Sequence, residues 1–227
     1  MIHVYGAADE PVPRLIAALA ARGHTVGGGR SGPGENATLV LGPGPALDEA
    51  ALGVLLGGWS KAPGARVLVL SLIGAHPDAR ALRLHRLWEL EERARGSGLP
   101  VLTLRLAPLV GPTSPLWLKL RTRPRLPREG RQLLNPVAET DVIETLERAL
   151  DGRAKWKGWF ELAGADAISL AELAALASAR GPGNGRGAWE PPLEEMAEHR
   201  LCEPGPWQRH FGIEPRPIAA LAAEWVA

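Results

Sequence analysis

The chain has 227 residues with a formal net charge of +1, so it can bury a substantial core, and its overall charge gives no reason to expect nucleic acid or an anionic membrane as a partner. Its one cysteine, Cys202, excludes an internal disulfide and fits a reducing compartment. A signal-peptide pattern is missing, and apolar runs such as 67–73 are too short to span a bilayer, so we expect a cytoplasmic protein without membrane insertion.

Helical and strand-like segments alternate along the first half of the chain, which predicts an α/β fold with a parallel sheet. The expected strands are apolar, β-prone runs at 2–5, 25–26, 38–41, 66–72 and 101–106. The expected helices lie at 12–22, 46–56 and 79–96. Only a short glycine-rich stretch, 27–36, separates the second strand from the third. Because it cannot hold a further helix and strand, we expect a sheet that is trimmed at one edge.

The pattern changes beyond residue 112. A basic, proline-interrupted stretch covers 116–131, and a short strand is expected at 159–162. Helices are expected at 139–150, 169–180 and 192–200, with a linker at 181–187. The chain ends in a helix rich in alanine and tryptophan. Ser169 is a plausible N-cap, and Glu172 three residues later completes a capping box. Arginine, proline and alanine are abundant, which is typical of a heat-adapted or a GC-rich source.

The first turn of the chain is its most informative motif. The run 2–5 ends at Gly6, and after a short turn an Ala/Leu-rich helix ends at Arg22-Gly23-His24. This order resembles the opening of an atypical short-chain dehydrogenase/reductase, in which the turn reads G-A-T-G-x-x-G. Gly6 matches the first glycine of that motif, whereas Asp9 and Val12 stand in the places of the second and third.

These two replacements bear on cofactor binding. In a dinucleotide-binding turn, the glycines let the backbone approach the pyrophosphate, which sits on the free amides of the helix N-terminus. Val12 places a β-branched side chain where the close approach is needed. Asp9 is a favoured N-cap residue, Pro11 suits a first helical turn, and Asp9 and Glu10 complement the helix dipole. We therefore expect the helix to satisfy its own N-terminus with carboxylates, which would repel a diphosphate.

The resemblance continues through four later segments, at 66–75, 104–111, 135–142 and 160–173. They are similar to the family's active-site serine strand, its "L-R-P-x-x-x-x-G" segment, its "p-v-x-x-x-D-V-A" stretch and its "y-x-L-x-G-x-x-x-S-x-x-E-L" stretch. Within this family, the segments resemble those of the NmrA-like and complex-I-accessory-like group. The resemblance implies a Rossmann-like doubly wound parallel sheet at 1–112, trimmed at one edge. It also implies a small C-terminal α/β subdomain of the substrate-binding type at 113–227, part of which returns to the sheet.

The family's catalytic pair is replaced in this chain. Relatives use a tyrosine as general acid or base, a lysine that lowers its pKa, and a serine that orients the carbonyl. Ser71 matches the serine, but the tyrosine position falls on Arg83 and the lysine position on Leu87. The one tyrosine, Tyr5, lies in the first strand. If the chain is an enzyme, the catalytic candidates are Ser71, Arg83 and His85.

The resemblance also implies an NAD(P) site, if binding is retained. The residues that would line it are Gly6, Ala7, Ala8, Asp9, Val12, Arg30, Leu41, Gly42, Ser71, Ala107 and Pro108. Arg30 follows the second strand, where the family holds a 2′-phosphate, so it indicates either NADP preference or a solvated loop arginine. No group of His, Cys, Asp and Glu has metal-ligand spacing.

Other reactive side chains have structural explanations. His76 and His85 lie near the expected cleft, but neither has a partner carboxylate at a fixed spacing, which favours surface roles. Cys202 has no evident base and follows the pattern of a structural cysteine, because neighbouring Glu203 would raise its pKa. The eight tryptophans are expected in the core, although Trp225 could contact a partner or a second copy.

A local basic run is formed by Lys119, Arg121, Arg123, Arg125, Arg128 and Arg131. It indicates a phosphorylated substrate, an anionic partner or nucleic acid, or simply a solvated surface loop. The lack of interleaved aromatic residues counts against single-stranded nucleic acid.

Three functions remain open from the sequence. The first is a divergent member of the dehydrogenase/reductase group without oxidoreductase activity, acting as a ligand-responsive regulatory or accessory protein. The second is an NADP-dependent oxidoreductase or epimerase-like enzyme that uses Arg30, Ser71, Arg83 and His85. The third is an interaction scaffold that binds a protein partner through the basic run and the C-terminal helix, or forms a homodimer through the trimmed edge.

Overall fold

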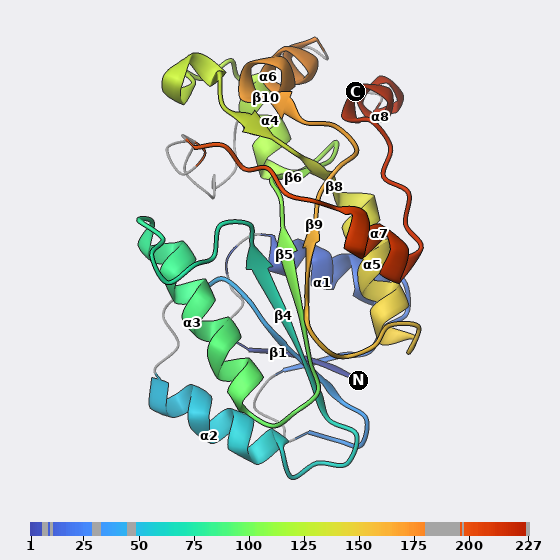
Figure 1. Cartoon of the computed structure of the whole chain (residues 1–227). Coiled ribbons are helices and arrows are strands. Elements are labelled where there is room, and N and C mark those ends of the chain that lie inside the picture. Colours follow the sequence, from blue (N-terminus) through green and yellow to red (C-terminus); the bar gives the residue numbers. More distant parts are fainter. Residues whose placement is uncertain are drawn as a thin grey trace. The chain divides into compact units, whose positions relative to one another are not determined.

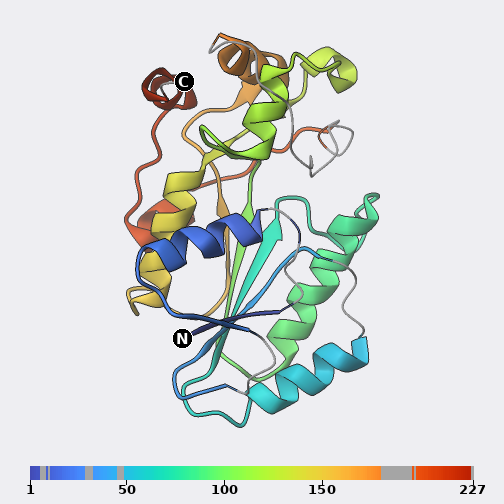
Figure 2. The same cartoon turned by 180° about the vertical axis from the view of Figure 1, so that it is seen from behind.

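The computed structural model describes residues 1–5, 9, 11–28, 33–44, 49–179, 196 and 198–225. The chain forms two compact units, of which the first comprises Met1–Arg105 and Leu146–Phe160 and the second comprises Leu106–Thr145 and Glu161–Ala227. Figure 1 labels the elements in chain order, and Figure 2 gives the view from behind. In the described part of the chain, no helix combines the length and the apolar character needed to cross a membrane.

A six-stranded sheet has the order β2-β1-β3-β4-β5-β9. The strands are β1 (Ile2–Tyr5), β2 (Val26–Gly28), β3 (Thr38–Leu41), β4 (Arg66–Leu72), β5 (Val101–Leu106) and β9 (Trp159–Leu162). β1 pairs in parallel with β2 and β3, and β3 pairs in parallel with β4. β2 forms one edge, with no strand beyond it among the described residues, so the predicted α/β sheet with a trimmed edge is confirmed.

Helices cover both faces of this sheet. α1 (Val12–Ala21) lies on one face, and α2 (Glu49–Trp59) and α3 (Leu82–Gly96) lie on the other, as the two views show (Figures 1 and 2). Because side chains alternate along a strand, the odd-numbered residues of β3 and β4 point toward α2 and α3. They form one core with these helices, whose members include Leu39, Leu41, Val67, Val69, Leu52, Leu56, Leu84, Leu87 and Leu90.

Two helix boundaries differ from the sequence prediction. α3 begins at Leu82 rather than Ala79, because His76–Ala81 is taken up by turns and Ala81 is still extended, with φ −75° and ψ 117°. α2 ends at Trp59 rather than Leu56, and its predicted start at Ala46 lies outside the described residues.

A buried ion pair joins α3 to β5. Glu91 has 0% side-chain exposure and Arg105 has 16%. Arg105 donates from Nη2 to Oε2 of Glu91 at 2.6 Å and from Nε to Oε1 at 3.0 Å. The guanidinium also lies 4.7 Å from the ring centroid of Trp159 in β9. One arginine therefore connects α3, β5 and the edge strand β9.

We predict that Glu91→Ala lowers the free energy of unfolding by about 3–5 kcal/mol, because it leaves the Arg105 charge without its buried partner. The neighbouring Glu92→Ala is the control, since Glu92 is 43% exposed and pairs only with the equally accessible Arg95. Urea denaturation followed by circular dichroism measures both. Equal effects of the two substitutions would contradict a structural role for the buried pair.

The second unit contains short elements. Its helices are α4 (Pro115–Arg121), η1 (Pro127–Gly130), the first half of α5 (Glu139–Leu150), α6 (Leu170–Ser178), α7 (Gly205–Phe211) and α8 (Ile218–Glu224). β7 (Leu133–Leu134) pairs with β10 (Ile168–Ser169), and β6 (Leu109–Val110) pairs with β8 (Val137–Ala138). The predicted capping box of Ser169 and Glu172 is confirmed at the start of α6. The predicted linker 181–187 and most of the predicted helix 192–200 lie outside the described residues.

The tryptophans mostly pack within the units, as predicted. Trp59, Trp117 and Trp207 are at most 2% exposed. Trp225 is only partly exposed, because its ring packs edge-on against Trp117 with 4.8 Å between centroids. Its ring therefore has a contact inside the second unit, and the contact with a partner or a second copy stays a prediction.

Asp141, in the first half of α5, is the most perturbed carboxyl group of the second unit. Burial, and then the nearby charge of Glu144, raise its pKa from 3.8 to about 6, although a hydrogen bond from Thr140 and the charge of Arg216 act in the opposite direction. Its Oδ2 atom is buried and accepts no hydrogen bond in the described structure. Ionised Asp141 therefore destabilises the fold at neutral pH.

Asp141→Asn should stabilise the protein at pH 7 by about 1 kcal/mol, after allowance for the solvent that still reaches the side chain. The pKa in the folded state lies above that in the unfolded state, so the wild-type chain loses stability as the pH rises from about 4 to about 6. The difference between variant and wild type should shrink across that window as the pH falls. Thermal unfolding at several pH values measures it, and a gain that does not depend on pH would contradict the assignment.

Candidate functional site

The strand order of the sheet reverses at the carboxyl ends of β1 and β3. After β1 the chain adds β2 on one side and then returns to add β3 on the other, and ligands of such sheets bind at this reversal of strand order. Tyr5, Leu41 and Val69 are direct neighbours across β1, β3 and β4. Leu41 and Gly42 at the end of β3 are buried. The residues at the carboxyl end of β3 are therefore packed into the protein.

A backbone hydrogen bond crosses this edge. The N–H of Asp9, which follows β1, donates to the carbonyl of Pro43, which follows β3, at 3.1 Å. The amide at the second glycine position of the motif is thus already bonded within the protein. Gly6, Ala7 and Ala8 lie outside the described residues. Pro43 was not among the predicted site residues, although its position between Gly42 and Gly44 directly after a strand was a signal for it.

The predicted N-cap of α1 is wrong for Asp9. The N-cap residue is Pro11, without a side-chain hydrogen bond, and the first turn of the helix contains no acidic residue. Asp9 contributes its backbone instead, since its carbonyl accepts from the N–H of Val12 at 3.2 Å. Because the N-cap is Pro11, the helix begins beyond Asp9, and the carboxylate of Asp9 does not act as the cap. Glu10 lies outside the described residues.

Val12 is packed into the protein rather than aimed at a ligand. Its side chain is 0% exposed, like that of Leu15 in the next turn. Glycine at this position allows a helix to pack closely against the strand before it, and valine fills that space with a side chain. Val12 is therefore a packing residue of α1, and its place beside a dinucleotide stays a prediction.

The positions of the family's catalytic pair lie on one stripe of α3. Arg83, Leu87 and Glu91 are spaced by four residues, so they share the face that points toward the sheet. Leu87 is 3% exposed and belongs to the core with Leu84 and Val69. Arg83 buries its Nε and Nη1 atoms. The lysine position is thus occupied by a core side chain.

Ser71, the serine among the predicted catalytic residues, is buried in β4. It is 0% exposed and lies two residues beyond Val69, so it faces the same side of the sheet as α3. α3 runs back along β4, which places its N-terminal half, with Arg83, at the same end of the sheet as Ser71. The buried Oγ has no hydrogen-bond partner in the described structure.

The two histidines have carboxylate neighbours that the sequence analysis did not anticipate. Nε2 of His85 lies 3.5 Å from Glu89 one turn later, and its Nδ1 lies 2.8 Å from the carbonyl of Pro77. Exposed His76 accepts a hydrogen bond from the N–H of Asp78 at 3.1 Å and lies 3.7 Å from its carboxylate. His85 is therefore held by the loop before α3.

Three further predicted cofactor residues lie outside the described part of the first unit. Ala107 and Pro108 belong to the second unit, where the N–H of Ala107 donates to Leu162 at 2.9 Å and the carbonyl of Pro108 accepts from Val137 at 3.0 Å. Arg30 lies outside the described residues. The described part of the chain contains no group of three or more His, Cys, Asp or Glu that could hold a metal ion.

Cys202 has the properties of a structural cysteine. Burial, and then the charge of Glu161, raise the pKa of its thiol from 9.0 to about 12. The responsible carboxylate is thus Glu161, not the adjacent Glu203 named from the sequence. The N–H of Cys202 donates to Oδ1 of Asn135 at 3.3 Å, which fixes this segment beside β7.

We expect iodoacetamide to modify Cys202 at pH 8 at least about tenfold more slowly than free cysteine, because only the thiolate reacts. Since the chain has one cysteine, mass spectrometry reads the rate directly. Glu161→Gln should leave the reaction slow, because burial is the larger cause of the raised pKa. A rate equal to that of free cysteine would contradict the burial.

Comparison with known proteins now places the architecture. No protein-family model matches the sequence, and no curated protein matches it significantly. Solved structures do. The enzyme MoeE5 in complex with UDP-glucose and NAD superposes with a TM-score of 0.67 and 18% identity, over 99% of this chain and 97% of that one.

Two further solved structures share this fold. TunA, an NAD-dependent NDP-hexosamine 5,6-dehydratase, matches with a TM-score of 0.65 and 15% identity, over 99% of this chain and 96% of that one. A UDP-glucose 4-epimerase from Thermotoga maritima matches with a TM-score of 0.64 and 15% identity, over 99% and 97% of the two chains. These matches confirm the predicted Rossmann-like architecture, and the low identities fit a divergent sequence.

Proposed function

We propose that this protein has no oxidoreductase activity and acts as a ligand-responsive regulatory or accessory protein on a dehydrogenase/reductase fold. The observation that carries the proposal is Leu87. At the position where the family resemblance implies a lysine that holds the nicotinamide ribose, the side chain is a leucine with 3% exposure, packed in the core between α3 and the sheet. A hydrocarbon side chain in that place can neither lower the pKa of a neighbouring acid nor bind a ribose.

Two further features support the loss of hydride chemistry. Arg83 takes the tyrosine position, and a permanently charged guanidinium cannot serve as a general acid near neutral pH. The Asp9 N–H is bonded to the Pro43 carbonyl at 3.1 Å, which removes one donor from the set that would hold a pyrophosphate. NAD or NADP is the natural ligand to test, because the structurally similar MoeE5 binds NAD. We infer that any dinucleotide binds weakly.

The proposal predicts no rise in melting temperature with NADH or NADPH at micromolar concentration, and no oxidation of either with UDP-sugar or carbonyl substrates. Tryptophan fluorescence and thermal shift measure binding, and absorbance of the reduced nicotinamide measures turnover. MoeE5, whose structure contains NAD, serves as the positive control for binding. Turnover by the purified protein would refute the proposal, and saturable binding at micromolar cofactor would refute the inference that a dinucleotide binds weakly.

One observation favours an enzyme with other catalytic groups. Ser71 keeps its hydroxyl buried and without a hydrogen-bond partner in the described structure, which is a state that a bound substrate could relieve. In that case Arg83 would supply the positive charge and His85 a proton-transfer group, as the second sequence hypothesis states. Ser71→Ala and Arg83→Ala should then each abolish a measurable turnover, while Arg86→Ala on the exposed side of α3 should not.

A further inference from the structure

A short basic surface in the second unit has no role in the proposed function. Three arginines between α4 and the end of η1, namely Arg123, Arg125 and Arg128, are exposed, and we call them the arginine ridge. The surrounding segment 119–131 holds six basic residues and one acidic residue, although the whole chain has a net charge of only +1. Positive charge is therefore concentrated here.

The ridge is held in a defined conformation. Exposed Arg123 and Arg125 alternate with half-buried Pro124 and Leu126, and Leu126 packs against the core of the second unit. Two arginines of the ridge therefore project on the solvent side, two residues apart. Pro124 and Pro127 fix their own φ angles, which lowers the entropy that the loop loses on binding a partner.

Two of the ridge arginines adopt a left-handed backbone. Arg123 has φ 53° and Arg128 has φ 47°, a region that non-glycine residues rarely occupy. Gly130 fastens the end of the segment, because a Cβ there would lie 2.8 Å from the backbone N of Ala171 in α6. The strained conformation is maintained by packing, as is common where side chains are positioned for binding.

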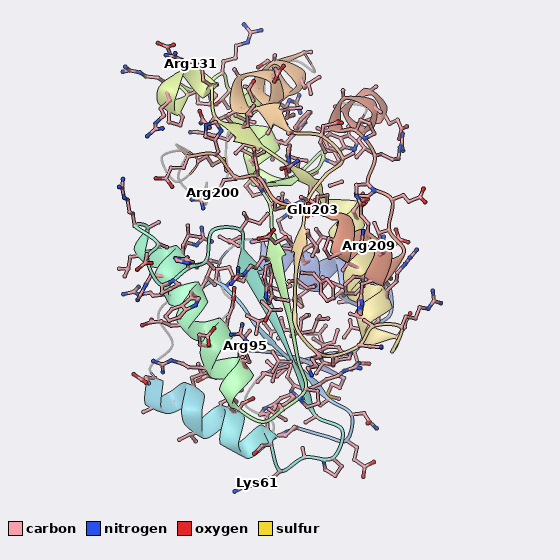
Figure 3. All side chains as sticks on the ribbon, in the orientation of Figure 1. Lys61, Arg95, Arg131, Arg200, Glu203 and Arg209 are labelled. Carbon is pink, nitrogen blue, oxygen red and sulfur yellow. The ribbon has the colours of Figure 1, made fainter. Side chains whose placement is uncertain are left out.

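The ridge arginines are not neutralised within the protein. Glu129, the one carboxylate of the segment, pairs with Arg131 at 2.8 Å, and both side chains are about four-fifths exposed. Figure 3 shows Arg131 at η1, pointing away from the ribbon. Among the described residues no carboxylate pairs with Arg123, Arg125 or Arg128. Three guanidinium groups thus remain available to an external anion.

The surroundings favour carboxylates of a protein over nucleic acid. Trp117 beside this segment is 1% exposed and Trp225 packs on it, so neither offers a face on which a base could stack. Outside this segment the chain carries a net negative charge, which would repel a long polyanion but not a short acidic peptide. An extended peptide presents alternate side chains on one side, which matches arginines two residues apart.

We propose that the arginine ridge is a docking surface for an extended protein segment with acidic residues at alternate positions. Each guanidinium pairs with a carboxylate, and the half-buried Pro124 and Leu126 offer apolar contact between the charges. The inference stands apart from the proposed function, because it needs neither a dinucleotide nor any residue of the first unit.

The test uses the full chain and a fluorescein-labelled peptide of alternating glutamate and serine, with a peptide of alternating glutamine and serine as the control. Fluorescence anisotropy at low and high salt measures binding. The variant is Arg123→Glu with Arg125→Glu. The matched control is Lys61→Glu with Arg209→Glu, which reverses two exposed charges outside the ridge. Figure 3 labels both residues.

We expect the glutamate peptide to bind at low salt, to weaken at high salt, and to lose at least about tenfold in affinity in the ridge variant but less than about twofold in the control. Circular dichroism of both variants verifies that they are folded. Absence of binding at low salt, or equal losses in the two variants, would overturn the proposal. Tighter binding of a single-stranded oligonucleotide or of phosphatidylserine vesicles than of the peptide would overturn it as well.

Discussion

The buried pair of Glu91 and Arg105 is the constraint on which the first unit depends. A carboxylate at 0% exposure is stable only with a charged partner in good geometry, and Arg105 provides two hydrogen bonds while its guanidinium lies over Trp159. This pair fixes which face of α3 is directed at the sheet. Leu87 lies one turn earlier on the same face and therefore points into the core. The predicted lysine position is thus occupied by an apolar side chain.

Much of the sheet could be predicted because its signals are local. β4 is a continuous apolar run, as expected for a strand of a sheet that is covered on both faces. The capping box of Ser169 and Glu172 is a contact between residues only three positions apart. The start of α3 was missed because Ala79–Ala81 has good helix formers, and only the turns around Pro77 exclude them from the helix. α7 was missed because its glycine and proline start gives no helical signal.

The candidate site was predictable only in part, for the same reason. Leu41, Gly42 and Ser71 lie at the ends of β3 and β4, as predicted, because strand ends are readable from the sequence. The bond between Asp9 and Pro43 joins residues far apart in the chain, and the cap of α1 depends on where two prolines start the helix, so neither followed from residue type. The carboxylate neighbour of His85 was within reach of the sequence, since Glu89 lies four residues later on the same helix.

The packing of Leu87 has an evolutionary consequence. A lineage that acquired lysine at this position would bury an ammonium group among leucines and valines, at a penalty of several kcal/mol. Lysine at position 87 is therefore compatible with this fold only together with changes in the leucines and valines around it. A single substitution cannot introduce that charge without a loss of stability.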